Sequence, residues 1–128
     1  DRDPPERFVR LRQQLGVTSF GLNELYLRPG ERSRIHRHER QEEVYLVIAG
    51  ELTLLLEGGE EHTLAVGDLA RVGPDVRRQL VNRGSERLQL LALGGLGEHQ
   101  GRDGRAYHSW DESGDGHSPA EVPFPDDE

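Results

Sequence analysis

The sequence contains no cysteine, no methionine and no lysine among its 128 residues. Without cysteine, neither disulfide bonds nor thiolate metal ligands can contribute to this protein. No apolar run approaches the roughly 20 residues that a membrane-spanning helix needs, and no segment resembles a signal peptide. We therefore expect a cytoplasmic protein with no membrane partner. A chain of this length is expected to form one domain with a modest core.

Acidic residues outnumber basic ones, because 24 aspartates and glutamates against 16 arginines give a net charge of −8. This balance argues against a general nucleic-acid binder. The acidic residues are concentrated at the C-terminal end, where glycine, proline and serine are also frequent. We therefore predict that residues 98–128 form an acidic tail. Such a tail would be ordered only where Tyr107, Trp110 or Phe124 finds a groove.

Hydrophobic spacing predicts a short helix followed by strands. Phe8, Leu11 and Leu15 have helical spacing before Gly16, so Pro5–Leu15 is expected to be an amphipathic helix within an N-terminal extension, residues 1–17. Residues 18–97 contain short apolar segments separated by turn residues, a pattern typical of an all-β sandwich or barrel. The predicted strands are Thr18–Leu27 with a bulge near Asn23, Val44–Ile48, Leu52–Leu56, His62–Ala65, Leu69–Val72, Val76–Asn82 and Glu86–Leu93.

Two details of these strands carry further expectations. The continuous apolar run Val44–Ile48 is typical of a strand that is covered on both faces. The two glycines at positions 58 and 59 are expected to form a hairpin turn between two strands.

The stretch PGERSRIHRHERQEEVYLVIAG, residues 29–50, places His36 and His38 one residue apart. Side chains at alternate positions of a strand point to the same face, so both imidazoles would face the same way. An antiparallel neighbour carrying Glu43 would place a carboxylate beside them. Two imidazoles and one carboxylate suit divalent Fe, Mn, Ni, Co or Zn with open coordination positions. Glu42 could replace Glu43 if the loop were one residue shorter, and two solvent-facing histidines are the plain alternative.

The same stretch follows the pattern G-x5-H-x-H-x4-E-x6-G from Gly30 to Gly50. This pattern resembles the first motif of the cupin superfamily, whose members are small double-stranded β-helix, or jelly-roll, barrels. The resemblance covers roughly residues 18–93. It implies the all-β cupin barrel as the fold class, and a homodimer as the assembly.

The stretch GDLARVGPDVRRQLVN is similar to the second cupin motif, G-x5-P-x-G-x2-H-x3-N. Gly67 and Asn82 match this motif, and Pro74 lies one place past its proline. Asp75 stands where the family usually has glycine. Arg78 stands where the family usually has its third histidine, so the resemblance is incomplete at the position of a metal ligand.

Arg78 leaves two arrangements open, because a guanidinium stays protonated and cannot ligate a metal. At about 5 Å from a divalent ion, its charge would repel the ion by on the order of 6–7 kcal/mol at an effective dielectric near 20. Arg78 would then pair with Glu43 and leave the pocket free of metal. Alternatively, its long side chain would reach the pocket rim and bind a carboxylate or phosphate of a substrate.

Two functions follow from the resemblance. The first is a metal-dependent dioxygenase, decarboxylase or isomerase that acts on a small anionic metabolite, with the ion on His36, His38 and Glu43. Arg78 would orient the substrate, and Tyr45, which shares the strand parity of Glu43, would contact the substrate or assist proton transfer. A core tyrosine is the plain alternative for Tyr45. The second function is a non-catalytic ligand-binding or sensing protein without metal.

Overall fold

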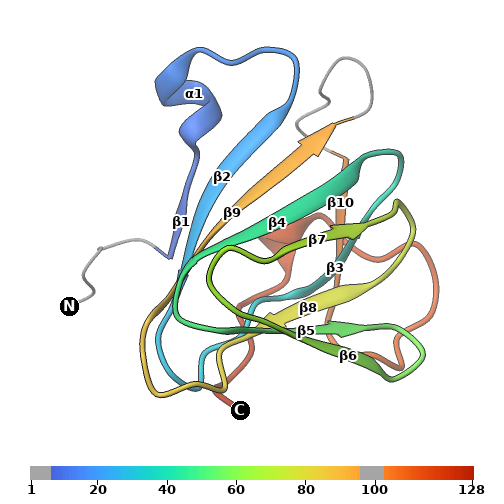
Figure 1. Cartoon of the computed structure of the whole chain (residues 1–128). Coiled ribbons are helices and arrows are strands. Elements are labelled where there is room, and N and C mark those ends of the chain that lie inside the picture. The colour runs from blue at the N-terminus through green and yellow to red at the C-terminus, as the bar shows by residue number, and fades with distance from the viewer. Residues whose placement is uncertain (1–6, 96–102) are drawn as a thin grey trace.

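The computed structural model describes residues 7–95 and 103–128, and its strands form two facing antiparallel sheets (Figure 1). The predicted all-β jelly-roll fold is confirmed. The first sheet has the order β1 (Phe8–Val9), β2 (Gly21–Leu27), β9 (Leu88–Gly95), β4 (Glu42–Ala49) and β7 (Leu69–Val72). The second sheet has the order β10 (Gly104–Tyr107), β3 (Ile35–His38), β8 (Arg78–Val81), β5 (Leu52–Leu56) and β6 (Glu60–Leu64).

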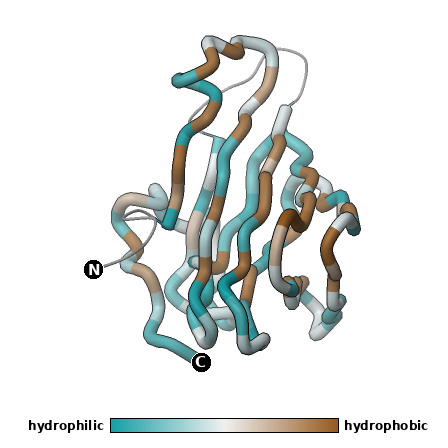
Figure 2. The backbone as a smooth tube through the Cα atoms, turned by 60° about the vertical axis from the view of Figure 1, so that its left-hand side comes forward, coloured by the Kyte–Doolittle hydropathy of each residue, from teal (hydrophilic) through white to brown (hydrophobic). Residues whose placement is uncertain are grey.

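The core lies between the two sheets. The inward-facing side chains of β4, β5, β8 and β9 meet there, and the most deeply buried apolar ones include Val47, Leu54, Leu80 and Leu90. Hydrophobic residues recur along the strands, whereas the C-terminal end of the chain is hydrophilic (Figure 2). No helix in the described part of the chain is long and apolar enough to span a bilayer.

The apolar run of β4 is covered on one face only. Tyr45 and Val47 are buried between the sheets, but Val44 and Leu46 are half-buried and Ile48 is exposed on the outer face. The expectation that both faces of this strand are covered is therefore wrong for the single chain. The hairpin predicted at the two glycines is found between β5 and β6.

The N-terminal helix is shorter than predicted. Helix α1 spans Leu11–Leu15, and Phe8 and Val9 instead form β1, which pairs with β2. Pro5 lies outside the described residues. The bulge predicted near Asn23 is also wrong, because β2 pairs with β9 in an unbroken register from Gly21 to Leu27. The apolar residues change phase along β2 because Leu22 faces outward opposite Leu93, whereas Leu27 is buried between the sheets.

The segment that the sequence predicted as an acidic tail contributes a strand to the second sheet. Strand β10 pairs with β3 in the register Gly104 with His38 through Tyr107 with Ile35. The 3-10 helix η1 (Pro119–Glu121) follows, and Phe124 then lies under the guanidinium groups of two arginines. Residues 98–102 of the predicted tail lie outside the described part of the chain.

The motif glycines occupy tight turns between strands. Gly50 has φ +80°, and a Cβ there would lie 2.6 Å from the carbonyl oxygen of Arg87, so the turn after β4 excludes any side chain. Gly67 has φ +89°, but a Cβ there would meet no atom within 4 Å. Asp75 has φ +67°, the one positive φ outside glycine in residues 7–95 and 103–128. Its backbone N–H donates to the carbonyl of His38 at 2.8 Å, which joins this turn to the end of β3.

Candidate metal centre

The three predicted ligands come from opposite sheets. His36 and His38 lie on β3 in the second sheet, and Glu43 lies on β4 in the first. The expectation that Glu43 lies on an antiparallel neighbour of β3 is therefore wrong. The chain crosses between the sheets through residues 39–41, so the inward-facing side chains of β3 and β4 meet across the interior of the barrel.

The distances suit a single bound ion. His36 Nε2 lies 3.5 Å from Glu43 Oε1, and His38 Nε2 lies 3.3 Å from Glu43 Oε2. Two atoms that ligate one ion at about 2.0–2.1 Å lie about 2.8–3.4 Å apart at octahedral or tetrahedral angles. One ligand atom from each residue lies within 4.8 Å of the others, so the cluster could hold a metal ion. Glu42 is excluded, because it is exposed and pairs with Arg71.

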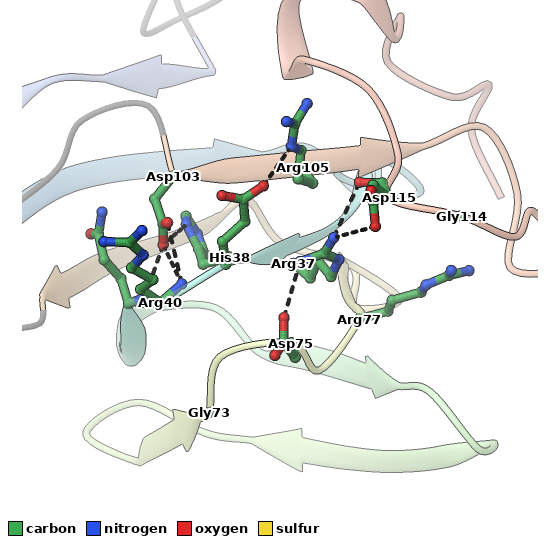
Figure 3. Close-up of polar contacts among 12 residues, drawn as sticks. Arg37, His38, Arg40, Gly73, Asp75, Arg77, Asp103, Arg105, Gly114 and Asp115 are labelled. Atoms are coloured by element: carbon green, nitrogen blue, oxygen red, sulfur yellow. Dashed lines mark hydrogen bonds and ion pairs between the residues drawn. The ribbon is translucent and has the colours of Figure 1, made fainter.

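Each imidazole has a polar neighbour near its Nδ1 atom. The Nδ1 atom of His36 lies 3.2 Å from the carbonyl oxygen of Arg34. When Nδ1 donates this hydrogen bond and Nε2 carries no proton, Nε2 can ligate an ion beside Glu43. The Nδ1 atom of His38 lies 3.9 Å from a carboxylate oxygen of Asp103 (Figure 3). This separation is longer than a hydrogen bond, and His38 Nδ1 has no hydrogen-bond partner among the described residues.

Asp103 is the residue of this site that the sequence analysis missed. It is buried, and its carboxylate accepts hydrogen bonds from the backbone N–H groups of Arg40 and Gln41 at 2.9 and 2.8 Å. Asp103 therefore ties the start of β10 to the turn between β3 and β4. It was assigned to the acidic tail, and no spacing in the sequence connects it to His38.

Glu43 is ionised and held from several sides. The Tyr45 hydroxyl donates to Glu43 Oε1. Burial alone would raise the pKa of Glu43, but hydrogen bonds from His36 and His38, together with their charge, hold it well below its ordinary value. Burial, and then the charge of Glu43, raise the pKa of Tyr45 well above its ordinary value. Tyr45 therefore keeps its proton at neutral pH, and in this structure it is a buried residue that orients Glu43.

Arg78 lies inside the barrel beside the carboxylate. It is the cross-strand partner of His36 and is 0% exposed. Its Nη1 atom lies 3.7 Å from Glu43 Oε1, and its Nη2 atom donates to the carbonyl of Gly73 at 2.9 Å. Neither Nε nor Nη1 has a hydrogen-bond partner among the described residues. Of the two arrangements left open by the sequence, the structure has the pair with Glu43, and the side chain does not extend to the rim.

Solvent reaches the centre past the two imidazoles. The side chains of His36 and His38 are 20% and 21% exposed, whereas Glu43 and Arg78 are buried behind them. Two surface hollows lie elsewhere. One of about 340 Å³ lies beside α1, and one of about 490 Å³ lies between the β5–β6 hairpin and Trp110. We identify the candidate metal centre from its side chains, because neither hollow is lined by His36, His38 or Glu43.

Two solved structures that resemble this chain are named as sugar phosphate isomerases. The one from Silicibacter pomeroyi, described as a sugar phosphate isomerase from a cupin superfamily, is 29% identical with a TM-score of 0.67, and the match covers 80% of this chain and 65% of that one. The putative sugar phosphate isomerase from Acidithiobacillus ferrooxidans is 26% identical with a TM-score of 0.64, over 75% and 60% of the two chains. This chain therefore spans less than two thirds of the length of either protein.

A more distant structure has a different named activity. The DMSP lyase from Ruegeria pomeroyi is 26% identical with a TM-score of 0.53, over 61% of this chain and 39% of that one. No curated protein matches the sequence. Residues 23–94, more than half of the chain, match the family described as "Cupin domain". With its two facing sheets and this family match, the protein belongs to the cupin domain family.

Proposed function

We propose that this protein binds a divalent transition-metal ion at His36, His38 and Glu43, and that it isomerises a small anionic metabolite of the sugar phosphate class there. The observation that supports this proposal best is the guanidinium of Arg78. It lies in the interior next to the ligand cluster and has two N–H-bearing nitrogens without a hydrogen-bond partner among the described residues. A metal donor set beside a buried cation favours an anionic ligand.

The two donors of Arg78 that lack a hydrogen bond set the size of the expected effect. A buried donor without a hydrogen bond costs about 1–3 kcal/mol. A phosphate or carboxylate oxygen that reached Nε or Nη1 would satisfy that donor with a charge-assisted hydrogen bond. The field of a buried charge is also screened less than that of a surface charge. Arg78 would therefore select for an anion over a neutral compound of the same shape.

The other residues of the centre would hold the ligands in place. A bound divalent ion would supply Lewis-acid polarisation of a substrate oxygen. The carbonyl of Arg34 orients His36, and Asp103 lies beside the outer nitrogen of His38. Tyr45 donates to Glu43 and so fixes the carboxylate. In this proposal Tyr45 is a positioning residue rather than a proton carrier, because its raised pKa keeps it protonated.

The choice of reaction rests on the comparisons. Dioxygenases, decarboxylases and isomerases were all open on the sequence, and two of the similar structures are named as sugar phosphate isomerases at 29% and 26% identity. Isomerisation of a sugar phosphate needs an anion site and a polarised oxygen in one pocket, and Arg78 beside the ligand cluster offers both. We therefore favour the isomerase over the other two.

A metal-free binding protein is the second candidate, and one observation favours it. Arg78 Nη1 lies 3.7 Å from Glu43 Oε1, so the carboxylate already has a cationic partner without any metal. In that state the barrel would bind an anion through Arg78 alone and would catalyse nothing.

One experiment separates the two candidates. The protein is stripped of metal, reloaded with each of Mn²⁺, Fe²⁺, Co²⁺, Ni²⁺ and Zn²⁺, and assayed on a panel of phosphorylated aldoses and ketoses. We expect turnover that requires the ion and is lost in His36→Ala, with a raised KM in Arg78→Gln. Binding of a sugar phosphate that is equal in the metal-free protein and in His36→Ala, without turnover, would instead establish the second candidate.

We also propose a homodimer formed through the outer face of the first sheet. Val44, Leu46, Leu91 and Leu93 are only half-buried on this face, and Leu69 is 66% exposed. Apolar residues on neighbouring strands of one sheet form a continuous face of the kind that mediates association. Light scattering should give the mass of two chains for the wild type and of one chain for Leu69→Glu. A wild-type monomer at micromolar concentration would refute this assembly.

A further inference from the structure

The loop that follows β10 carries a second group of side chains that can ligate a metal. His108, Glu112 and His117 each offer one ligand atom, and these atoms all lie within 4.8 Å of one another. None of the three belongs to the barrel centre or to the two motifs of the barrel. We propose that they form a second binding site, for a borderline divalent transition-metal ion such as Zn²⁺. This proposal stands independently of the function proposed for the barrel.

The ligand atoms are close enough to converge on one ion. His117 Nε2 lies 2.5 Å from a carboxylate oxygen of Glu112, and the ring centroids of His108 and His117 are 4.9 Å apart. Two tetrahedral ligands of zinc lie about 3.3 Å apart, so closure needs shifts of no more than about 1.5 Å. Exposed side chains make such shifts by rotation about their χ angles. The ring of His108 is exposed and contacts the ring of His117, and the backbone N–H of His108 donates to Glu112 Oε1 at 2.7 Å.

The backbone of this loop is already fixed at its base. Ala106 and His117 exchange backbone hydrogen bonds of 2.9 and 2.8 Å, which close the loop between them. Gly116 allows this closure, because a Cβ at that position would lie 2.9 Å from the carbonyl oxygen of Ala106 and 2.9 Å from the ring of Tyr107. The imidazole of His117 therefore leaves the backbone from a constrained position.

Two arginines hold the rest of the loop. Arg77 Nη1 donates to the carbonyl of Glu112, and its guanidinium lies 3.8 Å from the ring centroid of Tyr107. Arg37 Nη2 donates to the carbonyl of Asp115 at 3.2 Å, and Figure 3 shows Arg37 between Asp75 and Asp115. A loop fixed in this way loses little entropy when an ion binds. Because both guanidinium groups repel a cation, we expect micromolar affinity rather than the tight binding of a structural zinc site.

The chemistry of the set points to an ion of intermediate softness. Two imidazole nitrogens and one carboxylate oxygen suit Zn²⁺, Co²⁺, Ni²⁺ and Cu²⁺ better than the oxygen-preferring Mg²⁺ or Ca²⁺. Because the site is at the surface, water can complete the coordination. A bound ion would link the two ends of the loop and so hold the C-terminal segment on the second sheet.

The test titrates Zn²⁺ into the full chain by calorimetry, in a background of His36→Ala with His38→Ala that removes the barrel ligands. We expect one Zn²⁺ per chain, and affinity weaker by about tenfold or more when His117→Asn is added. The matched control is His62→Asn. His62 lies 2.8 Å from Glu60 at the surface, but no third ligand joins them among the described residues, so its loss should change nothing. No saturable binding in the background, or equal affinity with and without His117, would overturn the proposal.

A second measurement keeps the test decisive if the background variant does not fold. Trp110 is the only tryptophan of the chain and lies within the loop. Cu²⁺ added to the otherwise unaltered chain should quench Trp110 fluorescence to saturation. His117→Asn should abolish this quenching, whereas His36→Ala should retain it. Quenching that depends on His36 and not on His117 would place the ion in the barrel and refute the loop site.

Discussion

Replacement of Arg78 by histidine is the sharpest perturbation of the barrel centre. The guanidinium lies 3.7 Å from the carboxylate of Glu43. An ion bound to that carboxylate at about 2.1 Å would be roughly 5 Å from the charge of Arg78. Charges of +1 and +2 at about 5 Å repel by on the order of 6–7 kcal/mol at an effective dielectric near 20. Water at the half-open imidazole face reduces this figure, so we take about 1.4 kcal/mol, or tenfold in affinity, as the smallest effect.

The variant acts in two ways that a control can separate. Arg78→His removes the positive charge and adds an imidazole beside His36, its cross-strand partner. Arg78→Gln removes the charge and adds no imidazole. Measured by competition against a chelating dye, the affinity for Zn²⁺ should be highest in Arg78→His, lower in Arg78→Gln and lowest in the wild type. A wild-type affinity equal to or tighter than that of both folded variants would refute the electrostatic reasoning and would show that the guanidinium does not oppose the ion.

Two further predictions concern stability, with Trp110 fluorescence in urea as the measurement. Gly50→Ala should lower the free energy of unfolding by about 2–4 kcal/mol, because the left-handed φ and a clash with the backbone both oppose a side chain there. Gly67→Ala should lower it by only about 1–2 kcal/mol, because Gly67 has a similar φ but no atom close by. Equal losses in the two variants would contradict the close approach at Gly50. Because the pKa of Glu43 is lowered in the folded protein, the metal-free wild type should be more stable than Glu43→Gln. This difference in stability should be complete above the ordinary carboxyl pKa of 4.5 and should shrink as the pH falls below it. A difference that grows in acid would contradict the lowered pKa.

The candidate ligands of the centre could be predicted because local rules place them. Alternation along a strand is enough to turn His36 and His38 to one face, and the count of residues to Gly50 selects Glu43 over Glu42. The turn that carries Asp75 was also marked in the sequence, by an aspartate where the family has glycine. Its positive φ explains the usual glycine.

The remaining features depend on contacts between distant residues. Gly104 pairs with His38 although the two are far apart in the sequence, and neither strand contains a sequence pattern that identifies the other as its partner. Asp103 lies near His38 only because β10 pairs with β3. The composition of residues 98–128 predicted a tail, so Asp103 was not predicted to lie at the site. The burial of Arg78 was likewise undecided, because the same side chain could pair with Glu43 or extend outward. Only the register of β8 against β3 resolves it.

The metal content of untagged protein tests the central claim most directly. We would measure it in the His117→Asn variant, so that the loop does not contribute, after reconstitution with a transition metal and removal of excess ion. The account predicts about one ion per chain, and less than about a tenth of that after His36→Ala is added. Folded protein that retains no ion, or an ion content that His36→Ala leaves unchanged, would contradict it.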